Sequence, residues 1–171
     1  RLEEGLAALL QVTARPDGQE PEAFMKLGAL YRSFKPPRVA EAVAAYEQAL
    51  KLDPKNGQAV LGMALTYRAG KQWGRAISAY ERVEQAYPRW KGEALLGTAW
   101  CHLLSGDDGK ARFYTGLAVN AGADVSGIRL ALARPAGSAT SGAELAELTG
   151  QLRSKDAGRQ ARAAQALLDM G

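Results

Sequence analysis

Two stretches of this chain repeat the same few residues at one fixed offset. Three residues recur 34 positions later: Ala42, Tyr46 and Pro54 return as Ala76, Tyr80 and Pro88. Little else in the two stretches is identical, and a looser third copy follows with Ala111 and Ala118. A fixed period of this length indicates a structural repeat, in which each unit buries its apolar face only against its neighbours. The chain is therefore expected to form a stacked array.

The apolar residues within each unit follow the spacing of a helix. The first unit shows this spacing twice, at Phe24, Leu27, Gly28 and Tyr31, and again at Ala42, Tyr46, Ala49 and Leu50. Ala, Leu, Glu, Arg and Gln are abundant while Ile and Thr are few, and this composition favours helix over strand. A Pro after each second helix stops it before the chain reverses. The sequence predicts an all-α protein whose repeat unit is a helical hairpin.

These residues resemble the tetratricopeptide repeat, which places a large apolar residue, Leu-Gly and Tyr in helix A and Ala, an aromatic residue, Ala and Pro in helix B. The second unit matches this pattern with Val60, Met63, Ala64, Tyr67, Ala76, Tyr80, Val83 and Pro88. In the first unit, two extra residues around Lys35-Pro36-Pro37 lengthen the internal turn. The resemblance implies a right-handed superhelix of about three hairpins over residues 17–124, with flanking helices.

The third unit and the N-terminal flank depart from the pattern. The third unit has His102 and Thr115 where aromatic residues are expected, and it lacks the terminal Pro. Such decay is common in a terminal repeat or where the neighbouring element changes type. Residues 1–16 are expected to form an orphan helix, either the remainder of a truncated upstream repeat or an N-terminal cap. We expect the chain to be a piece of a longer array.

The C-terminal flank, residues 125–171, is expected to form a smaller helical module. A short helix around Ile128–Ala133 leads into a Pro/Gly/Ser-rich linker, and Ser141 and Glu144 form a capping box that starts another helix. The stretch 148–171 resembles a HEAT-type repeat. A plain helical-hairpin cap is favoured over a HEAT repeat, because a single repeat does not define an array.

Residues suited to catalysis or metal binding are few. His102 is the one histidine of the chain, and Cys101 beside it would point about 100° away on a helix, so a Cys-His pair is not expected. The segment SGDDGK at 105–110 lacks the spaced ligands of a calcium loop and the full pattern of a phosphate loop. We predict no enzymatic activity, no metal site and no cofactor.

The resemblance implies a binding groove lined by one face of the A helices. The repeat register, which gives each residue its position within the repeat, assigns three sets of residues to that face. They are Glu22, Met25, Ala29 and Arg32, then Gln58, Leu61, Leu65 and Arg68, then Glu93, Leu96, Trp100 and Leu103. Lys and Asn side chains that would clamp an acidic C-terminus in this family are absent from the matching positions. The middle of the groove is apolar, and a segment of the chain itself filling it is an alternative that the sequence leaves open.

We expect another protein as partner, binding through an amphipathic helix or an extended apolar peptide that carries an acidic residue. The sequence predicts Trp100 and Leu61 as apolar anchors, with Arg32 and Arg68 orienting the acidic residue by charge pairing. Scaffolding between proteins is the expected role.

Nucleic-acid binding is the alternative, suggested by a net charge of +4 and a pI near 9.3. The cations of residues 57–91 are scattered over a turn, a second helix and a connection, without an aromatic stacking motif, so a protein partner is favoured.

The compartment is weakly specified. No apolar stretch of the sequence is long enough to cross a bilayer, and no signal-peptide pattern stands at its start. The single cysteine cannot form an internal disulfide. The cytoplasm is the default expectation, with the periplasm left open, and the Ala-, Gly- and Arg-rich surface hints at a bacterial source.

Overall fold

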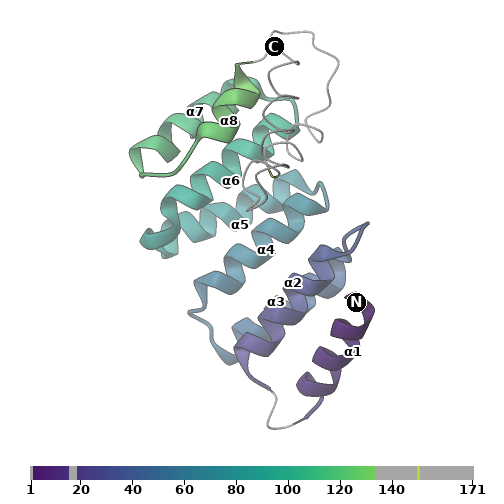
Figure 1. Cartoon of the computed structure of the whole chain (residues 1–171). Helices are drawn as coiled ribbons and strands as arrows, with labels where there is room; N and C mark the ends of the chain where they lie inside the picture. Colours follow the sequence, from purple (N-terminus) through teal and green to yellow (C-terminus); the bar gives the residue numbers. More distant parts are fainter. Residues whose placement is uncertain (1, 16–18, 134–149, 151–171) are drawn as a thin grey trace.

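The computed structural model describes residues 2–15 and 19–133, together with residue 150. Its helices are α1 (Leu2–Thr13), α2 (Pro21–Ser33), α3 (Val39–Leu52), α4 (Gly57–Ala69), α5 (Trp73–Ala86), the 3-10 turn η2 (Pro88–Trp90), α6 (Lys91–Leu104), α7 (Asp108–Asn120) and α8 (Ser126–Leu132). No strand occurs within these residues, and the helices stack side by side in chain order from α1 to α7 and α8 (Figure 1). The all-α prediction is confirmed.

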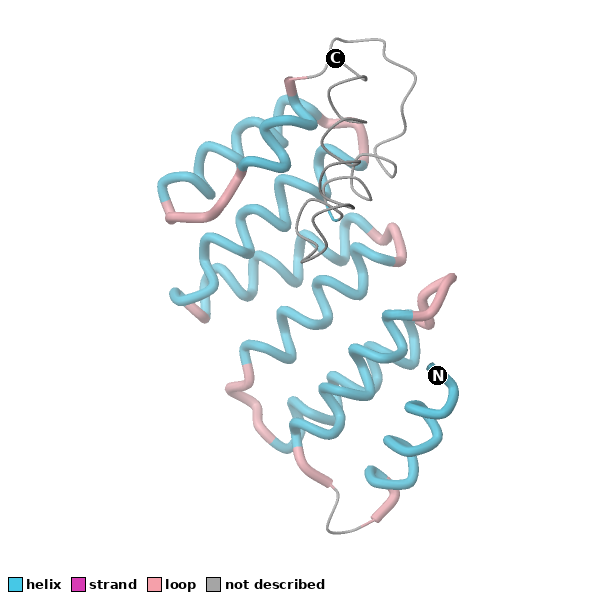
Figure 2. Tube along the Cα trace, in the orientation of Figure 1, coloured by secondary structure: helices cyan, strands magenta, loops and turns pink. Residues whose placement is uncertain are grey.

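Three consecutive hairpins make up the array. Helices α2 and α3, α4 and α5, and α6 and α7 pair by packing along their lengths, and α3 contacts α4 as α5 contacts α6. Figure 2 shows how short turns join the two helices of each pair. The A helices of the hairpins, α2, α4 and α6, therefore run in the same direction on one side of the array. The arrangement is the helical-hairpin solenoid that the sequence predicts.

The turn inside the first hairpin is longer than the other two. Residues 34–38 separate α2 from α3, whereas residues 70–72 and 105–107 make the corresponding turns of the second and third hairpins. The extra length coincides with Lys35-Pro36-Pro37, as the sequence predicts. Arg38 at the end of this turn places its guanidinium 4.2 Å from the ring centre of Phe34 and reaches Glu3 of α1 at 2.9 Å, so the turn also holds α1 against the first hairpin.

The two repeated tyrosines fill the junctions between successive hairpins. Tyr46 of α3 lies against Gly28 of its own hairpin and Gly62 of the next, and both glycines lack room for a methyl group. A Cβ atom on Gly28 would lie 2.8 Å from Tyr46 Cε2, and one on Gly62 would lie closer still to the same ring. Tyr80 of α5 meets Gly97 of α6 in the same way. Ring and glycine together set how closely one hairpin approaches the next.

The third hairpin is completed by a different neighbour. Thr115, which stands where the tyrosine would be, is buried and donates a hydrogen bond at 2.7 Å to the Ala111 carbonyl of its own helix. The short helix α8 contacts α6 and α7, and its Ile128 and Leu132 belong to the same buried cluster as Leu95 of α6. Because a seven-residue helix takes the place of a full hairpin, the large ring is not needed here.

Among the described residues, a single helix packs on each end of the three-hairpin array. Helix α1 packs on α2, and Leu6 of α1 shares a buried cluster with Leu27. At the other end, α8 occupies the place of the expected helix near Ile128–Ala133. The linker, the capping box of Ser141 and Glu144, and the HEAT-like stretch 148–171 lie outside the described residues, apart from residue 150.

Candidate functional site

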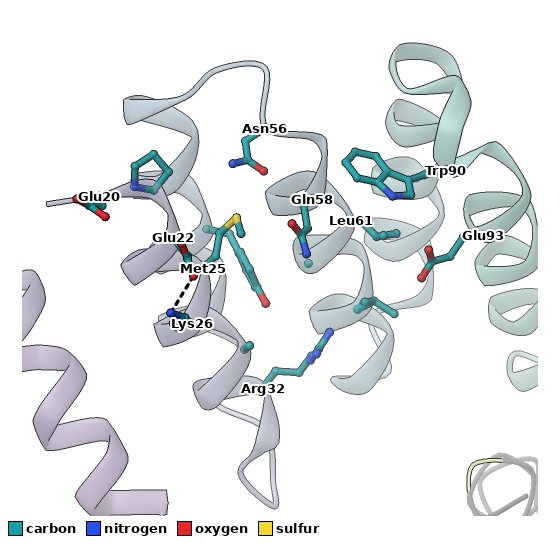
Figure 3. Close-up of a pocket in the computed structure, with 15 residues that line it drawn as sticks. Glu20, Glu22, Met25, Lys26, Arg32, Asn56, Gln58, Leu61, Trp90 and Glu93 are labelled. Carbon is teal, nitrogen blue, oxygen red and sulfur yellow. Dashed lines mark ion pairs between the residues drawn. The ribbon is translucent and has the colours of Figure 1, made fainter. Parts of the chain in front are cut away.

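A pocket of about 860 Å³ lies across the A helices and is shown in Figure 3. Helix α2 forms one wall, α4 forms the floor, and η2 with the first turn of α6 forms the opposite wall. We call it the A-helix pocket, defined by the lining residues Glu20, Pro21, Glu22, Met25, Lys26, Ala29, Arg32, Tyr46, Asn56, Gln58, Leu61, Gly62, Leu65, Trp90 and Glu93. Its volume falls in the range of sites that hold one ligand or a few side chains of a partner.

The floor of the pocket is apolar. Leu61 is buried and Leu65 half-buried on α4, while Met25 and Ala29 face them from α2 and are also half-buried. The spacing of four residues within each pair places both members on one face of their helix. Because these side chains already pack against the core below them, they offer a firm apolar surface without unfolding any element.

The edge of the pocket at the start of the A helices is shaped by Trp90 and Asn56. The Asn56 side chain caps α4 by accepting a hydrogen bond at 3.0 Å from the Ala59 amide, which fixes the first turn. Trp90 and Tyr87 lie directly over Gly57, leaving no space for a side chain there, and their rings are 5.7 Å apart. A half-buried indole is thereby held at the rim.

Charged side chains border the apolar floor. Glu22 and Lys26 form an exposed ion pair at 2.8 Å, and this hydrogen bond lowers the pKa of Glu22 and raises the pKa of Lys26. Glu93 is exposed on the α6 side. Arg32 is half-buried, and its side chain extends over the floor toward α4 in Figure 3. Within the described part of the chain, Arg32 makes no ion pair.

Five of the nine residues predicted to bind a partner line this pocket. They are Met25, Ala29, Arg32, Leu61 and Leu65. Arg68, which is half-buried in the last turn of α4, lies outside the pocket lining, although its charge acts on the buried Tyr80 hydroxyl.

Leu96, Trp100 and Leu103 lie elsewhere than the repeat register suggests. All three pack in the cluster between α6, α7 and α8, and Trp100 is only 9% exposed. The register assumes that each A helix presents the same face to the groove, but the change of neighbour after the third hairpin draws this face of α6 into the core. The structure therefore gives no support to Trp100 as an accessible anchor.

Seven residues of the pocket lining are absent from the face that the repeat register assigns: Glu20, Pro21, Lys26, Tyr46, Asn56, Gly62 and Trp90. Trp90 belongs to a 3-10 turn between repeats, where a register of helix positions does not reach. Its aromatic character beside Pro88 was the available signal. Tyr46 was recognised as a core residue, but its ring also borders the pocket beneath Gly62.

A buried polar pair lies under the neighbouring junction. The Tyr80 hydroxyl has no hydrogen-bond partner in the described part of the chain, and burial raises its pKa to about 12. Burial also raises the pKa of the nearby Cys101 thiol to about 11. Both groups stay neutral at ordinary pH, so Cys101 is not suited to act as a nucleophile.

Alkaline pH should therefore destabilise the fold through Tyr80. An unfolded tyrosine ionises near pH 10, whereas the pKa of the buried Tyr80 is about 12. Tyr80 therefore leaves the free energy of unfolding unchanged below about pH 10 and lowers it as the pH rises from about 10 to about 12. Between pH 8 and pH 11, the free energy of unfolding should fall by about 1 kcal/mol less in Tyr80→Phe than in the wild type. Urea unfolding at the two pH values tests this, and Cys101 titrates in both proteins. Equal losses would contradict the assignment.

Catalytic groupings are not found in the described residues. His102 stacks on Tyr114 with ring centres 5.3 Å apart and lies 4.0 Å from Asp107, the residue that caps α7 through the Lys110 amide. That backbone hydrogen bond, more than any other interaction, lowers the pKa of Asp107. No cluster of three or more potential metal ligands occurs among the residues described, and none of their helices has the length and apolar character to span a membrane.

The hairpins and their glycine-tyrosine junctions define a helical-repeat solenoid with a pocket across its A helices. Residues 38–89, which cover α3, α4 and α5, match the tetratricopeptide repeat family. No curated protein and no solved structure matches the chain. Residues 38–89 thus carry a tetratricopeptide-type repeat within an all-helical hairpin array. The match to this repeat supports a role in protein–protein interaction in general.

Proposed function

We propose that this protein captures a short apolar segment of a partner protein in the A-helix pocket, with an acidic residue of that segment bound by Arg32. The carrying observation is the apolar floor of Met25, Leu61 and Leu65 with the half-buried guanidinium of Arg32 extending over it, which makes no ion pair with the residues that the structure describes. An apolar surface gives affinity by excluding water, while a partly desolvated guanidinium favours a carboxylate in a fixed place. Arg68 occupies the equivalent place in the last turn of α4 and adds a second positive charge on this side of the array.

The basic residues of the second unit support a protein partner over nucleic acid. Lys91 pairs with Glu84 at 3.5 Å, Arg89 lies over Trp90 at 4.5 Å from the ring centre, and Arg75 bonds Gln72 at 3.1 Å. These cations already have partners within the chain, so fewer charges stay available for phosphates than the net charge suggests.

Filling the pocket tests the proposal. Ala29 is half-buried in the α2 wall, so Ala29→Gln would place a polar side chain over the apolar floor. Phage displaying random 12-residue peptides would be selected on the wild type, on Ala29→Gln, and on Ala40→Gln as a matched control at an exposed position of α3 outside the pocket lining. Peptides selected on the wild type should bind Ala29→Gln at least about tenfold more weakly, a change of about 1.4 kcal/mol, by fluorescence anisotropy.

The control variant decides what a loss means. Ala40→Gln should bind the selected peptides as the wild type does, and circular dichroism should show all three proteins folded. Peptides that bind all three proteins equally would place the binding site outside the pocket. If no peptide is enriched more on the wild type than on Ala29→Gln, capture in this pocket is refuted.

A further inference from the structure

The charges around the A-helix pocket are separated by sign. Because α2, α4 and α6 run in one direction, their first turns lie at one edge of the pocket, and the last turn of α2 lies at the other. The first edge carries Glu20, Glu22 and Glu93, which we call the acidic edge. Arg32 in the last turn of α2 lines the other edge, and Arg68 in the last turn of α4 lies outside the pocket lining; we call these two residues the basic edge. The apolar floor lies between two edges of opposite charge.

Helix dipoles account for only part of this arrangement. Acids near the first turn and bases near the last turn of a helix are each favourable toward the macrodipole. Any exposed position in those turns would satisfy that demand. In this chain the charges are gathered around one apolar floor, and the guanidinium of Arg32 extends over that floor rather than into solvent (Figure 3).

The ion pairing within the pocket leaves charge of both signs unmatched. Lys26 lies at 2.8 Å from Glu22 and offsets one acid, which leaves Glu20 and Glu93 as the surplus of the acidic edge. Arg32 and Arg68 form no ion pair with any residue in the described ranges. A partner that meets both edges with complementary charges would gain from both, and one with charges of a single sign would be repelled at one of them.

We propose that the segment bound in the A-helix pocket is two-signed, with a Lys or Arg side chain at the acidic edge and an Asp or Glu side chain at the basic edge. This inference rests on the proposed capture of a partner segment and specifies its chemistry. The methylene stem of the cation would pack on the half-buried indole of Trp90 while its charge reaches Glu93.

The helix geometry gives the distance between the acidic and basic edges along the A helices. Glu22 and Arg32 are ten positions apart on α2, a rise of about 15 Å along the axis. An extended segment covers that distance in about five residues, and a helical one in about ten. The apolar residues between the two charges would cover Leu61 and Leu65.

The peptides selected on the wild type provide the probe. The consensus among peptides that bind the wild type but not Ala29→Gln should contain one cation and one acid, separated by about five or about ten residues. One such peptide, synthesised with blocked ends, would be compared with versions in which its acid or its cation is replaced by Gln. Each replacement should weaken binding by about three- to tenfold, as expected for losing one partly exposed charge pair.

Charge reversal in the protein identifies the pair at each edge. Arg32→Glu should lower the affinity for the two-signed peptide by about tenfold or more. A peptide whose acid is changed to Lys should restore most of the lost affinity of this variant. Glu93→Lys should behave in the same way toward a peptide whose cation is changed to Glu. The matched control is Arg82→Glu, an exposed residue of α5 outside the pocket, which makes the same change in net charge without affecting affinity. Arg32→Gln serves if Arg32→Glu does not fold.

The possible results separate this inference from the proposed function. A consensus that is apolar, or charged with one sign only, would overturn the two-signed segment while leaving capture in the pocket intact. Charge reversals that weaken every peptide equally, or that no complementary peptide restores, would also overturn it. Absence of any pocket-dependent peptide would instead refute capture itself.

Discussion

Replacing Trp100 by Ala should lower the free energy of unfolding by about 3–5 kcal/mol, the usual cost of removing a large buried aromatic side chain. Trp100 is 9% exposed and belongs to the cluster that joins α6 to α7 and α8, with Ile128 and Leu132 among its members. The substitution leaves a cavity at the place where the third hairpin is completed. Urea unfolding followed by circular dichroism measures the change.

Phe113→Ala is the matched control for this prediction. Phe113 lies on α7 and is 62% exposed, so removing its ring takes little apolar area out of the folded state. It should cost less than about 1 kcal/mol, including the edge contact with Tyr114 at 5.4 Å between ring centres. Equal effects of the two substitutions would show that Trp100 is not part of the core. Loss of partner capture by Trp100→Ala would not identify a contact residue, because the fold itself would be weakened.

The sequence predicted the hairpins well because their determinants are local. Helical spacing of apolar residues and a Pro after the second helix specify each hairpin without knowledge of its neighbours. For the same reason, Met25, Ala29 and Leu61 line one pocket as the repeat register predicts, since the two units that supply them are neighbours and each is followed by a complete hairpin. Register arguments hold where the surroundings repeat.

The third unit shows where this reasoning stops. The register assigned Leu96, Trp100 and Leu103 to the groove, but a residue is buried or exposed according to the element that packs on it. Here that element is α8, whose length and direction no repeat pattern specifies. Trp90 was missed for a related reason, because it lies in the connection between two repeats. Sequence periodicity therefore predicts the interior of an array better than its ends and its connections.

The separation of charge around the pocket was only partly predictable from the sequence. The repeat register placed Glu22 and Glu93 at equivalent positions, as it did Arg32 and Arg68, but Glu20 precedes α2 and has no place in a register of helix positions. Only the shared direction of the three A helices brings these acids to one edge. A charge count by segment cannot reveal this, since it averages residues on opposite sides of each helix.

Replacing Gly97 by Ala should destabilise the protein by about 2 kcal/mol, although Ala is the better helix former. The new methyl group would overlap Cζ and Cε1 of Tyr80 and lie 2.8 Å from Cε2. Tyr80 is only 1% exposed, so its ring has no free space into which it could turn. Either α6 moves away from α5 or the ring leaves its preferred rotamer, and both responses cost packing energy.

Gly116→Ala provides the opposite control within the same hairpin. Gly116 is in the middle of α7 with no atom near the position of an added Cβ, so the substitution should stabilise by about 0.5–1 kcal/mol. Chemical denaturation of both variants compares a clash with a pure helix-propensity gain. If Gly97→Ala also stabilised the protein, the junction between the second and third hairpins would be looser than the structure indicates.

A double variant tests whether the clash with the ring is the cause. Tyr80→Leu removes the aromatic ring atoms that the new methyl group would overlap, so Gly97→Ala should cost less in the Tyr80→Leu background than in the wild type. Such coupling is expected for residues in contact and is not expected for distant, independent sites. The equivalent contact of Tyr46 with Gly62 borders the A-helix pocket, so the spacing that these ring-to-glycine contacts impose on successive hairpins also determines the distance between the pocket walls. The residues that hold the array together therefore also set the width available to a bound segment.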